Sequence, residues 1–580
     1  MRDTMEKEEV IEHQYTGLFS FLSKSAPNKV FVSILLGVLA GAAYMLVIPL
    51  VTQSIELSSS AEPYPAVEDS FEWLGFEISK PRYAGAFLIL CAFILAARTA
   101  SSVLLQWVAI DATRDLRVRI FRRISQLPII ELERIGPSRL HSAIANDVPA
   151  IMAGVQSIPA ILINIATIAG LLGFLVYLNI HVFLFIIGTM IFGILTYRVP
   201  MSLANRFYGK ARRKLDDIQE GIRGLIYGAK ELKLNRTKRQ AFVEEALLAQ
   251  EEAFRSDSRW GSLLILTASN YGNMISFLAL GVAVFVISNR YSIEAGTLVA
   301  IAMAMLYITG PLGTILNSIT PVVRGSVALK ALNELFAMMP VEPSGPVESR
   351  AQVGSIDLRN ITLCYPQRDS AAAEFSLGPI DLTLRRGEIN FIVGGNGSGK
   401  STLGKILSLH YVPQEGVIRF DGDLVTAANR DQWRESVGAI YADFHLFRKL
   451  YGAPPDTVEN LAPRYLQRLG LNEKVAIRDG RFSTTALSEG QKKRLALLIL
   501  YLENRHVYVF DEWAADQDPQ FKELFYAQLL PELKAQGKLI IVITHDDRYY
   551  ALADRVIRME NGRILQDSSN SSVARSVVHG

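Results

Sequence analysis

The sequence predicts an all-α transmembrane domain of six helices followed by a soluble α/β domain. Three observations support this fold class. Long uncharged runs fill roughly the first 320 residues, whereas the remainder has the mixed composition of a soluble domain. Six of those runs approach or exceed the length of about 20 apolar residues that a helix needs to cross the hydrocarbon layer. After residue 353, short apolar strands alternate with helical patterns, as in an α/β sheet.

The domain boundaries are placed where the composition changes. The N-terminus is polar and acidic and lacks the pattern of a cleavable leader, and an amphipathic stretch at 15–22 is expected to lie at the membrane interface. A Pro-rich stretch at 340–350 breaks any helix before the soluble half. The predicted parts are a tail and interfacial helix at 1–28, the transmembrane domain at 29–325, a linker at 326–350, the soluble domain at 351–568 and a disordered tail at 569–580.

The charges around the spans predict their orientation. The spans lie at about 29–51, 83–110, 151–177, 180–199, 260–288 and 296–320. Lysine and arginine gather in segments 111–150 and 200–258, whereas segment 52–80 is acidic. Because cytoplasmic loops carry an excess of positive charge, we expect both chain termini in the cytoplasm.

The two basic segments are too long for turns and are rich in helix formers. We therefore expect the second membrane helix to continue to about residue 127 and the fifth to begin near residue 244. A glycine-marked stretch lies at the bottom of each pair of helices, at 131–142 and 220–234. Each is either a docking element for the soluble half or a solvated turn.

Several polar residues fall inside the spans. Arg98 is expected to snorkel towards the inner interface. The others either line a polar cavity or hydrogen-bond between helices, and both interpretations stay open for Asn164, Asn270, Asn273, Tyr307, Thr309 and Asn317.

A glycine-rich turn follows the apolar strand at 389–393 and opens a helix. Its spacing, G-x4-G-K-S, is that of a phosphate loop. Glycines let backbone N–H groups converge on an anion, the lysine reaches the terminal phosphates and the serine hydroxyl can hold Mg²⁺. The chain is therefore predicted to bind a nucleoside triphosphate through Gly394, Gly395, Asn396, Gly397, Ser398, Gly399, Lys400, Ser401 and Thr402.

Three further motifs follow along the chain. A helix begins within LSEGQ, which makes an anion site by geometry and dipole. An apolar strand ends in Asp511 and Glu512, of which the first can hold Mg²⁺ and the second can position an attacking water. The last strand ends in His545, within reach of a γ-phosphate if these strands are parallel neighbours.

In these motifs the soluble half resembles the nucleotide-binding domain of ATP-binding cassette (ABC) transporters. The six-span half in front of it resembles the transmembrane domain of the type IV exporter class. The resemblance implies that Tyr365 stacks on adenine, that Ser401 and Asp511 hold Mg²⁺, and that Glu512 and His545 are catalytic. It also implies a D-loop at Asp518 and a signature motif that acts on the nucleotide of a second subunit, formed by Leu487, Ser488, Glu489, Gly490 and Gln491.

The sequence departs from the family pattern at two places. Ala442 stands where the family usually has a glutamine that contacts Mg²⁺ and senses the transmembrane half, and Asp443 beside it is a candidate replacement ligand. The acidic and aromatic residues that precede the signature in many exporters are also missing from VAIRDGRFSTTA.

At finer grain, GGNGSGKST, LSEGQKKRLALL and FDEWAADQDP resemble bacterial exporters of cyclic peptides, lasso peptides and siderophore precursors, with Trp513 as the most distinctive residue. The resemblance implies a homodimer in the bacterial inner membrane that uses ATP and Mg²⁺ to export a peptide-like or amphipathic substrate. A lipid flippase, a broad-specificity drug exporter and an ATP-gated channel are the alternatives.

Composition excludes other classes. A net charge of +3 gives no support to nucleic-acid binding, and six spans argue against an ABC ATPase that acts on DNA. Two cysteines predict neither a disulfide framework nor a thiolate metal site. The outer segment 52–80 is either a lid or contact for a periplasmic partner, or an inert loop.

Overall fold

The computed structural model describes residues 17–59, 70–73, 76–79, 81–291, 293–345, 353–365 and 375–569. The chain divides into two compact units, Met1–Arg119 with Ser142–Glu334 and Ile120–His141 with Leu335–Gly580. Most of the predicted N-terminal tail and nearly all of the predicted C-terminal tail lie outside the described residues.

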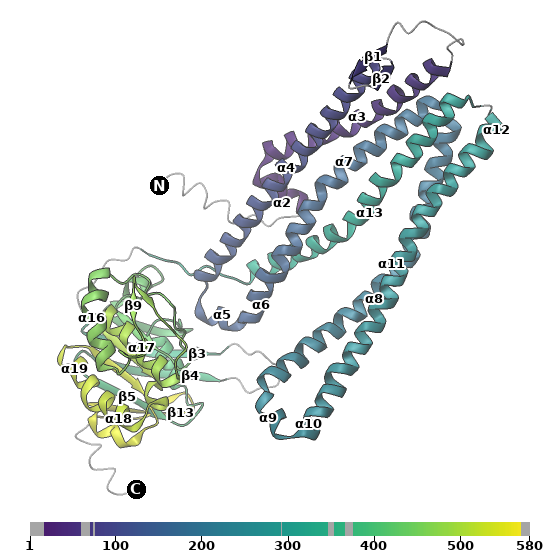
Figure 1. Ribbon diagram of the computed structural model, residues 1–580. Coiled ribbons are helices and arrows are strands. Elements are labelled where there is room, and N and C mark those ends of the chain that lie inside the picture. The colour runs from purple at the N-terminus through teal and green to yellow at the C-terminus, as the bar shows by residue number, and fades with distance from the viewer. Residues whose placement is uncertain are drawn as a thin grey trace. The chain divides into compact units, whose positions relative to one another are not determined.

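Six helices are long and apolar enough to cross a membrane, which confirms the six predicted spans. A short helix, α2 (Leu18–Ser25), precedes them at the place predicted for the interfacial segment. The spans lie on α3 (Pro27–Ser59), α4 (Pro81–Ser125), α7 (Val148–Leu178), α8 (Ile180–Tyr227), α11 (Ala249–Val282) and α13 (Ala295–Ala337) (Figure 1).

The helices extend beyond the apolar spans, further than the sequence analysis predicts at two ends. The fifth helix begins at α10 (Arg236–Ala241) and continues through a π-helical turn, η3 (Phe242–Leu248), into α11. Asn235 sets this start, because its side chain accepts a hydrogen bond from the N–H of Lys238 at 2.9 Å. Helix α13 runs to Ala337 and so occupies the first part of the predicted linker, where the run VALKALNELFA holds no glycine or proline.

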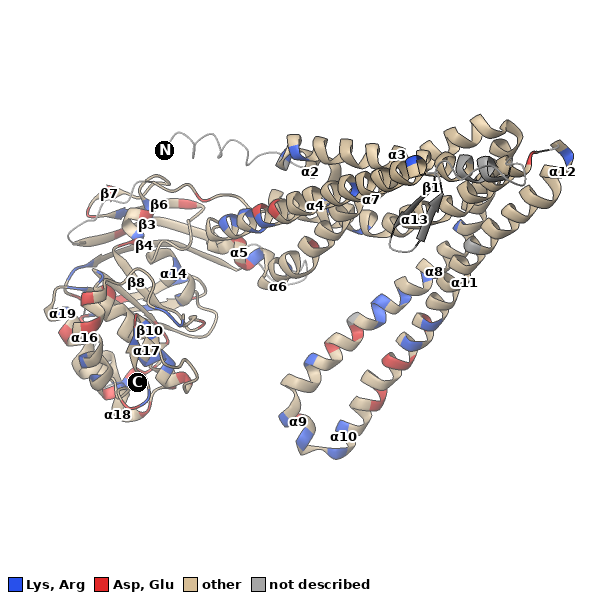
Figure 2. Ribbon diagram, turned by 45° about the horizontal axis from the view of Figure 1, so that its top comes forward, with Lys and Arg blue, Asp and Glu red and all other residues tan. Residues whose placement is uncertain are grey.

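Helices α8 and α11 lie side by side as a long antiparallel pair that ends at α9 (Ala229–Leu234) and α10 (Figure 1). Lysine and arginine residues are frequent on the part of this pair near α9 and α10 (Figure 2). At the other end, a tight turn at Asn179 leads from α7 into α8. The Asn179 side chain caps α8 by accepting hydrogen bonds from the N–H groups of His181 and Val182.

The outer segment 52–80 contains a small antiparallel hairpin. Its strands are β1 (Ser70–Trp73) and β2 (Phe76–Ser79), with Trp73 opposite Phe76. The side chains of this hairpin lie outside the description, so the lid and the inert loop both stay predictions.

The polar residues of the spans have different surroundings. The Arg98 guanidinium donates to the Tyr44 hydroxyl on α3 at 3.2 Å and lies 6.0 Å from the centroid of its ring, and its snorkelling stays a prediction. Tyr307 on α13 belongs to the same cluster, with its ring centroid 4.9 Å from that of Tyr44. Asn164 bonds the Ala160 carbonyl of its own helix. The side chain of Asn273 lies outside the description.

The soluble unit has two main sheets. The larger has the strand order β14-β13-β5-β12-β11-β8, and the other has the order β4-β3-β6-β7. Their strands are β3 (Ser355–Cys364), β4 (Ser376–Arg385), β5 (Ile389–Gly394), β6 (Glu415–Phe420), β7 (Asp423–Leu424), β8 (Val437–Ile440), β11 (Val507–Asp511), β12 (Leu539–Ile543), β13 (Arg555–Glu560) and β14 (Arg563–Ser569). A two-stranded ribbon, β9 (Ile477–Arg478) with β10 (Arg481–Phe482), lies apart from both.

The larger sheet is buried on both faces, as parallel sheets usually are. On one face, Phe391 and Phe510 pack into a core with helices α16 (Pro455–Arg468) and α17 (Glu489–Glu503). On the other, Ile392 and Val509 pack with the smaller sheet and with α14 (Lys400–Leu407). The remaining helices of the unit are α15 (Arg430–Arg434), α18 (Pro519–Leu524) and α19 (Leu530–Ala535), with the turns η5 (Trp513–Asp516), η6 (Phe525–Leu529) and η7 (Asp547–Leu552).

The second unit also includes the loop that joins α4 to α7. This loop holds α5 (Ile129–Ile135) and most of α6 (Pro137–Ser142). Ile129 and Ile130, just before the first glycine-marked stretch, pack against the core that contains α14. Glu133 within the stretch pairs with Lys405 at 2.8 Å, which confirms that this stretch docks on the soluble half. The corresponding role of 220–234 stays a prediction.

Candidate nucleotide site and membrane cavity

Three strands bring the predicted nucleotide residues to one edge of the larger sheet. Strands β5, β12 and β11 are parallel neighbours, with Asp511 opposite Ile543 and Ile543 opposite Ile392. Because the carboxyl ends of these strands meet, the phosphate loop, Asp511 and His545 lie at one edge of the sheet, which is where open α/β sheets bind ligands.

The phosphate loop has the backbone that its glycines permit. Gly399 has a φ of +95°, and a Cβ at this position would come within 2.7 Å of Leu377 Cδ1. Lys400 then begins α14, whose first-turn N–H groups have no partner within the helix. The Lys400 ammonium donates to the carbonyls of Gly394 at 3.0 Å and Gly395 at 2.8 Å, so it lies across the loop.

Charge and burial act together on these groups. Burial lowers the pKa of Lys400, and the nearby Glu512 and Asp511 carboxylates only partly offset this effect. The Ser398 hydroxyl oxygen is buried and has no hydrogen-bond partner among the described residues. A buried hydroxyl without a partner is costly, so this loop is suited to an anionic ligand with many acceptor oxygens.

Ser401 and Asp511 provide oxygen donors for a divalent cation. The Ser401 hydroxyl donates to Asp511 Oδ1 at 3.2 Å. Burial raises the pKa of the Asp511 carboxyl, although the hydrogen bond from Ser401 lowers it. Two hard oxygen ligands beside a phosphate loop fit Mg²⁺, which takes one or two protein oxygens together with phosphate oxygens and waters.

Asp443 lies near Lys405 and Tyr441. Burial is the largest influence on the pKa of each of these groups, and the charge of Asp443 makes a smaller contribution that raises both. Among the residues that the structure describes, no group of three or more His, Cys, Asp and Glu side chains is arranged to hold a metal ion. The replacement of the missing glutamine by Asp443 therefore stays a prediction.

Glu512 and His545 form a pair. His545 Nε2 lies 3.2 Å from Glu512 Oε1. Glu512 has a φ of +50°, in the left-handed region that non-glycine residues rarely adopt. Such strain persists only where the surrounding structure enforces it, and it clusters at functional sites. The Glu512 N–H is held by the Ile543 carbonyl at 3.0 Å.

Lys493 is a residue that the sequence analysis missed. Its side chain is only 5 % exposed, and its ammonium donates to the Glu512 backbone carbonyl at 2.8 Å and lies 2.7 Å from the Asp516 carboxylate. Trp513 in turn donates from its indole N–H to the Lys493 carbonyl at 2.9 Å. In sequence, Lys493 cannot be told from its exposed neighbour Lys492.

The signature residues form the start of α17. Ser488 and Gln491 make a capping box, in which the Ser488 hydroxyl accepts from the Gln491 N–H and the Gln491 side chain accepts from the Ser488 N–H. Ser488 and Glu489 are exposed, whereas Leu487 packs partly against the core. A Cβ on Gly490 would come within 2.7 Å of the Asp516 carbonyl oxygen.

The D-loop residue Asp518 caps α18 and meets the signature helix. It accepts from the Phe521 N–H at 2.9 Å and pairs with Arg494 at 2.5 Å. The hydrogen bond from the Phe521 N–H lowers the pKa of Asp518, desolvation opposes this effect, and the pairing with Arg494 lowers the pKa further. Gln517 also donates to the Gly490 carbonyl at 2.9 Å, so the D-loop and the signature form one connected surface.

Tyr365 lies at the end of β3. Its hydroxyl pairs with that of Tyr411 at 2.7 Å, and the two rings meet edge to face. The stacking of Tyr365 on adenine stays a prediction.

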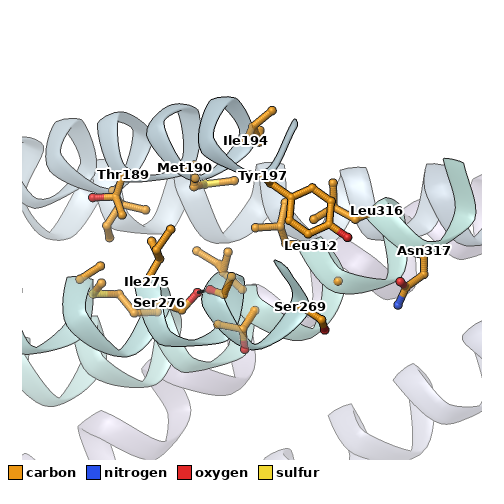
Figure 3. A pocket seen from close by; sticks show the side chains of 18 residues that line it. Thr189, Met190, Ile194, Tyr197, Ser269, Ile275, Ser276, Leu312, Leu316 and Asn317 are labelled. Atoms are coloured by element: carbon orange, nitrogen blue, oxygen red, sulfur yellow. Dashed lines mark hydrogen bonds between the residues drawn. The ribbon is translucent and has the colours of Figure 1, made fainter. Parts of the chain in front are cut away.

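Apart from the nucleotide site, the transmembrane unit contains a cavity of about 140 Å³ among α8, α11 and α13 (Figure 3). Its lining carries no charged side chain and combines apolar residues with hydroxyl and amide groups. The polar members are Thr189, Tyr197, Ser269, Ser276, Thr309 and Asn317. Two of the residues whose role the sequence left open, Thr309 and Asn317, thus line a cavity.

Comparisons with known proteins agree over nearly the whole chain. Residues 30–312 match the family model described as ABC transporter transmembrane region, and residues 377–515 match the model described as ABC transporter. "ATP-binding protein SyrD" of Pseudomonas syringae pv. syringae is 34% identical over 95% of this chain and 96% of its own length.

More distant relatives and a solved structure share the same arrangement. An "ATP-dependent lipid A-core flippase" of Thiobacillus denitrificans is 25% identical over 84% of this chain and 86% of its own length. A bacterial Atm1-family ABC exporter, solved with ATP bound, superposes with a TM-score of 0.68 at 18% identity and covers 96% of both chains.

Proposed function

Because the chain belongs to the ABC transporter family, as an ATP-hydrolysing exporter with an N-terminal transmembrane domain, we propose that it exports a peptide-type natural product as a homodimer. The membrane would be the bacterial inner membrane, with both termini in the cytoplasm, as the basic segments favour. The cargo would be a cyclic or lasso peptide or a siderophore precursor.

One observation supports the proposed homodimer. Each chain has one phosphate loop and one signature, and Ser488 lies exposed at the tip of α17. An exposed, capped helix start is a preformed anion site. A head-to-tail pair of chains would place Ser488, Gly490 and Gln491 of one subunit on the γ-phosphate held by Lys400 of the other.

The tip of the α8–α11 pair supports a second copy as the partner. Tyr227 ends α8 and is 85% exposed, and Leu234 ends α9 and is 89% exposed, although both lie beyond the apolar span predicted at 180–199. Large exposed apolar side chains in water mark interaction surfaces. Docking of this tip on the soluble unit of a second chain would bury them.

The proposed hydrolysis follows from the geometry at the sheet edge. Tyr365 would stack on adenine, and the phosphate loop would hold the phosphates. Mg²⁺, bound by Ser401 and Asp511, would neutralise charge on the phosphate oxygens. Glu512 would orient or deprotonate the attacking water, and His545 would stabilise the γ-phosphate. Closure of the two soluble domains would open the membrane cavity outwards, and hydrolysis would reset it.

The cavity supports an uncharged amide-rich or amphipathic cargo. Hydroxyl and amide groups such as those of Ser276 and Asn317 can pair with peptide groups, while the apolar lining takes a side chain or an acyl chain. A volume of about 140 Å³ is smaller than a drug-sized pocket. One chain would thus hold one side chain of the cargo, with the rest lying between the two copies.

The decisive experiment uses the full chain in lipid nanodiscs or liposomes. With Glu512→Gln, ATP should bind with ordinary affinity while turnover falls at least about 100-fold, as expected when the group that positions the water is lost. Turnover near that of the native protein would refute the assigned role. A purified protein that transports at full rate as a stable monomer would refute the homodimer.

A lipid flippase is the second candidate, favoured by the relatives named lipid A-core flippases. The two functions separate by what accelerates ATP hydrolysis. Peptides secreted by the parent strain and missing from a deletion strain should stimulate the purified protein. Stimulation by membrane lipid alone would favour the flippase.

A further inference from the structure

A continuous set of hydrogen bonds joins α5, in the loop between α4 and α7, to Tyr365 at the end of β3. It begins at Glu133 on α5, which lies in the same compact unit as the soluble domain. Lys405 donates to Glu133 Oε1 at 2.8 Å, and the Tyr411 hydroxyl donates to Glu133 Oε2. Both oxygens of this carboxylate are therefore engaged by the soluble domain.

Tyr411 extends the set to Tyr365. Its single hydroxyl proton is donated to Glu133, so the 2.7 Å contact with the Tyr365 hydroxyl must be one that Tyr411 accepts. Lys405 also donates to the Tyr411 oxygen, at 3.3 Å. The Tyr411 hydroxyl thus uses its proton and both lone pairs, and its side chain is only 1% exposed.

Lys405 is a further member of this set. It lies on α14, the helix that Lys400 begins. Burial lowers the pKa of Lys405, but the hydrogen bond and the charge of Glu133 raise it further, so the ammonium stays protonated. Burial and the bonds to Glu133 and Tyr365 raise the pKa of Tyr411 well above its usual range, so its hydroxyl keeps its proton.

The other position that could link the nucleotide to the transmembrane half has no polar side chain. Ala442 stands there, and it ends in a methyl group. A methyl group neither donates nor accepts a hydrogen bond. The polar route from α5 runs instead to the aromatic side chain at the end of β3 and to the helix behind the phosphates.

We propose that Glu133 is a positioning residue that couples adenine binding at Tyr365 to the docking of α5, through Tyr411 and Lys405. Stacking of adenine on the Tyr365 ring fixes its hydroxyl against Tyr411, which strengthens the hold on Glu133. Coupling of this kind is reciprocal, so a docked α5 raises the affinity for adenine nucleotides by the same factor. This inference rests on the proposed contact of Tyr365 with adenine.

The first measurement is hydrogen exchange of the amides in α5 of the full chain in nanodiscs. A non-hydrolysable ATP analogue should raise their protection, whereas tripolyphosphate, which occupies the phosphate loop without a base, should not. Tyr365→Phe keeps the ring for stacking but removes the hydroxyl, so it should abolish the difference between the two ligands. Retention of the full difference in Tyr365→Phe would overturn the proposal.

The second measurement is affinity. Glu133→Gln should weaken binding of the ATP analogue roughly five-fold, at the low end of coupling between sites, and leave tripolyphosphate affinity unchanged. The matched control is Glu131→Gln on the same helix, whose carboxylate pairs with Arg134 at 2.6 Å and should have no effect on either ligand. Equal effects of the two variants, or equal weakening of both ligands, would show that Glu133 only stabilises the fold.

A double-mutant cycle separates coupling from two independent effects. If the hydroxyl of Tyr365 and the carboxylate of Glu133 act as one unit, the double variant should bind the ATP analogue no more weakly than the weaker single variant. Additive losses would overturn the proposal. Absence of peptide transport in the native protein would instead refute the proposed cargo and leave this coupling intact.

Discussion

Replacement of Lys493 by methionine should slow ATP hydrolysis without weakening ATP binding. The Lys493 ammonium donates to the Glu512 carbonyl and pairs with Asp516 in a nearly fully buried position. Methionine has a similar length but no donor, so the Glu512 carbonyl loses the partner that holds its left-handed backbone in place. These two partners of the ammonium both lie outside the phosphate loop, so the affinity for ATP should be unaffected.

The magnitude follows from the hydrogen bond that Lys493→Met removes. A hydrogen bond to a charged group contributes about 1.5–3 kcal/mol, and each 1.36 kcal/mol added to the barrier slows a reaction about tenfold. If most of that energy positions Glu512, the kcat for ATP should fall roughly 10- to 100-fold while KM stays within about twofold. The assay is phosphate release by the full chain in nanodiscs.

The adjacent lysine provides the control. Lys492 pairs with Glu489 at 2.7 Å on an exposed surface, where ion pairs contribute about 0–1 kcal/mol. Lys492→Met should therefore change kcat less than twofold. If Lys493→Met also leaves kcat within twofold, or if both variants lose activity equally, the positioning of Glu512 by Lys493 is refuted.

Three other perturbations test separate parts of the structure. Gly490→Ala places a Cβ against the Asp516 carbonyl, so it should reduce ATPase activity at least about tenfold while nucleotide binding persists, as measured with a fluorescent ATP analogue. Burial and the charges of Arg434 and Lys405 lower the pKa of His410. The neutral imidazole therefore contributes to stability above pH 6.5, and this contribution is lost as the pH falls through the folded-state pKa. His410→Asn should reduce the drop in unfolding temperature between pH 7 and pH 5 by a few degrees in a thermal scan. Asp443→Asn should raise the Mg²⁺ concentration for half-maximal ATPase activity about tenfold if this residue replaces the missing glutamine, and an unchanged Mg²⁺ titration would reject that role.

The large features can be predicted from local pattern. Each membrane span is marked by about 20 apolar residues, and the structure has a helix of sufficient length at all six places. The phosphate loop, Asp511 and His545 follow apolar strands, so parallel pairing of β5, β12 and β11 brings them together. Those inferences need only the sequence around each motif and one rule of sheet topology.

The helix ends are less predictable from hydropathy. An apolar run marks the part of a helix that contacts lipid, but the helix can continue into polar sequence on either side. The first part of 326–350 is polar enough to resemble a linker, yet α13 continues to Ala337. The contact of Arg98 escapes sequence prediction for a different reason. Its partner Tyr44 lies on another helix, and a lateral hydrogen bond across 54 positions leaves no local trace in the sequence.

The contacts that support the site residues are also not predictable from local sequence. Lys493 and Lys492 are identical neighbours in sequence, and only the turn of α17 buries one and exposes the other. Glu133 and Lys405 are separated by 272 positions. A pattern search along the chain finds residues that would touch a ligand, because ligands demand particular spacings, but not those that hold such residues in position.

The capping box at the start of α17 has a consequence for the proposed closure of two chains over the nucleotide. In the single chain, the Ser488 oxygen accepts the N–H of Gln491 through a lone pair. A hydroxyl has one proton and two lone pairs, so this bond leaves the proton available. An arriving phosphate oxygen can accept that proton in a hydrogen bond without unwinding the helix tip, so this serine can engage the nucleotide and cap its own helix at the same time.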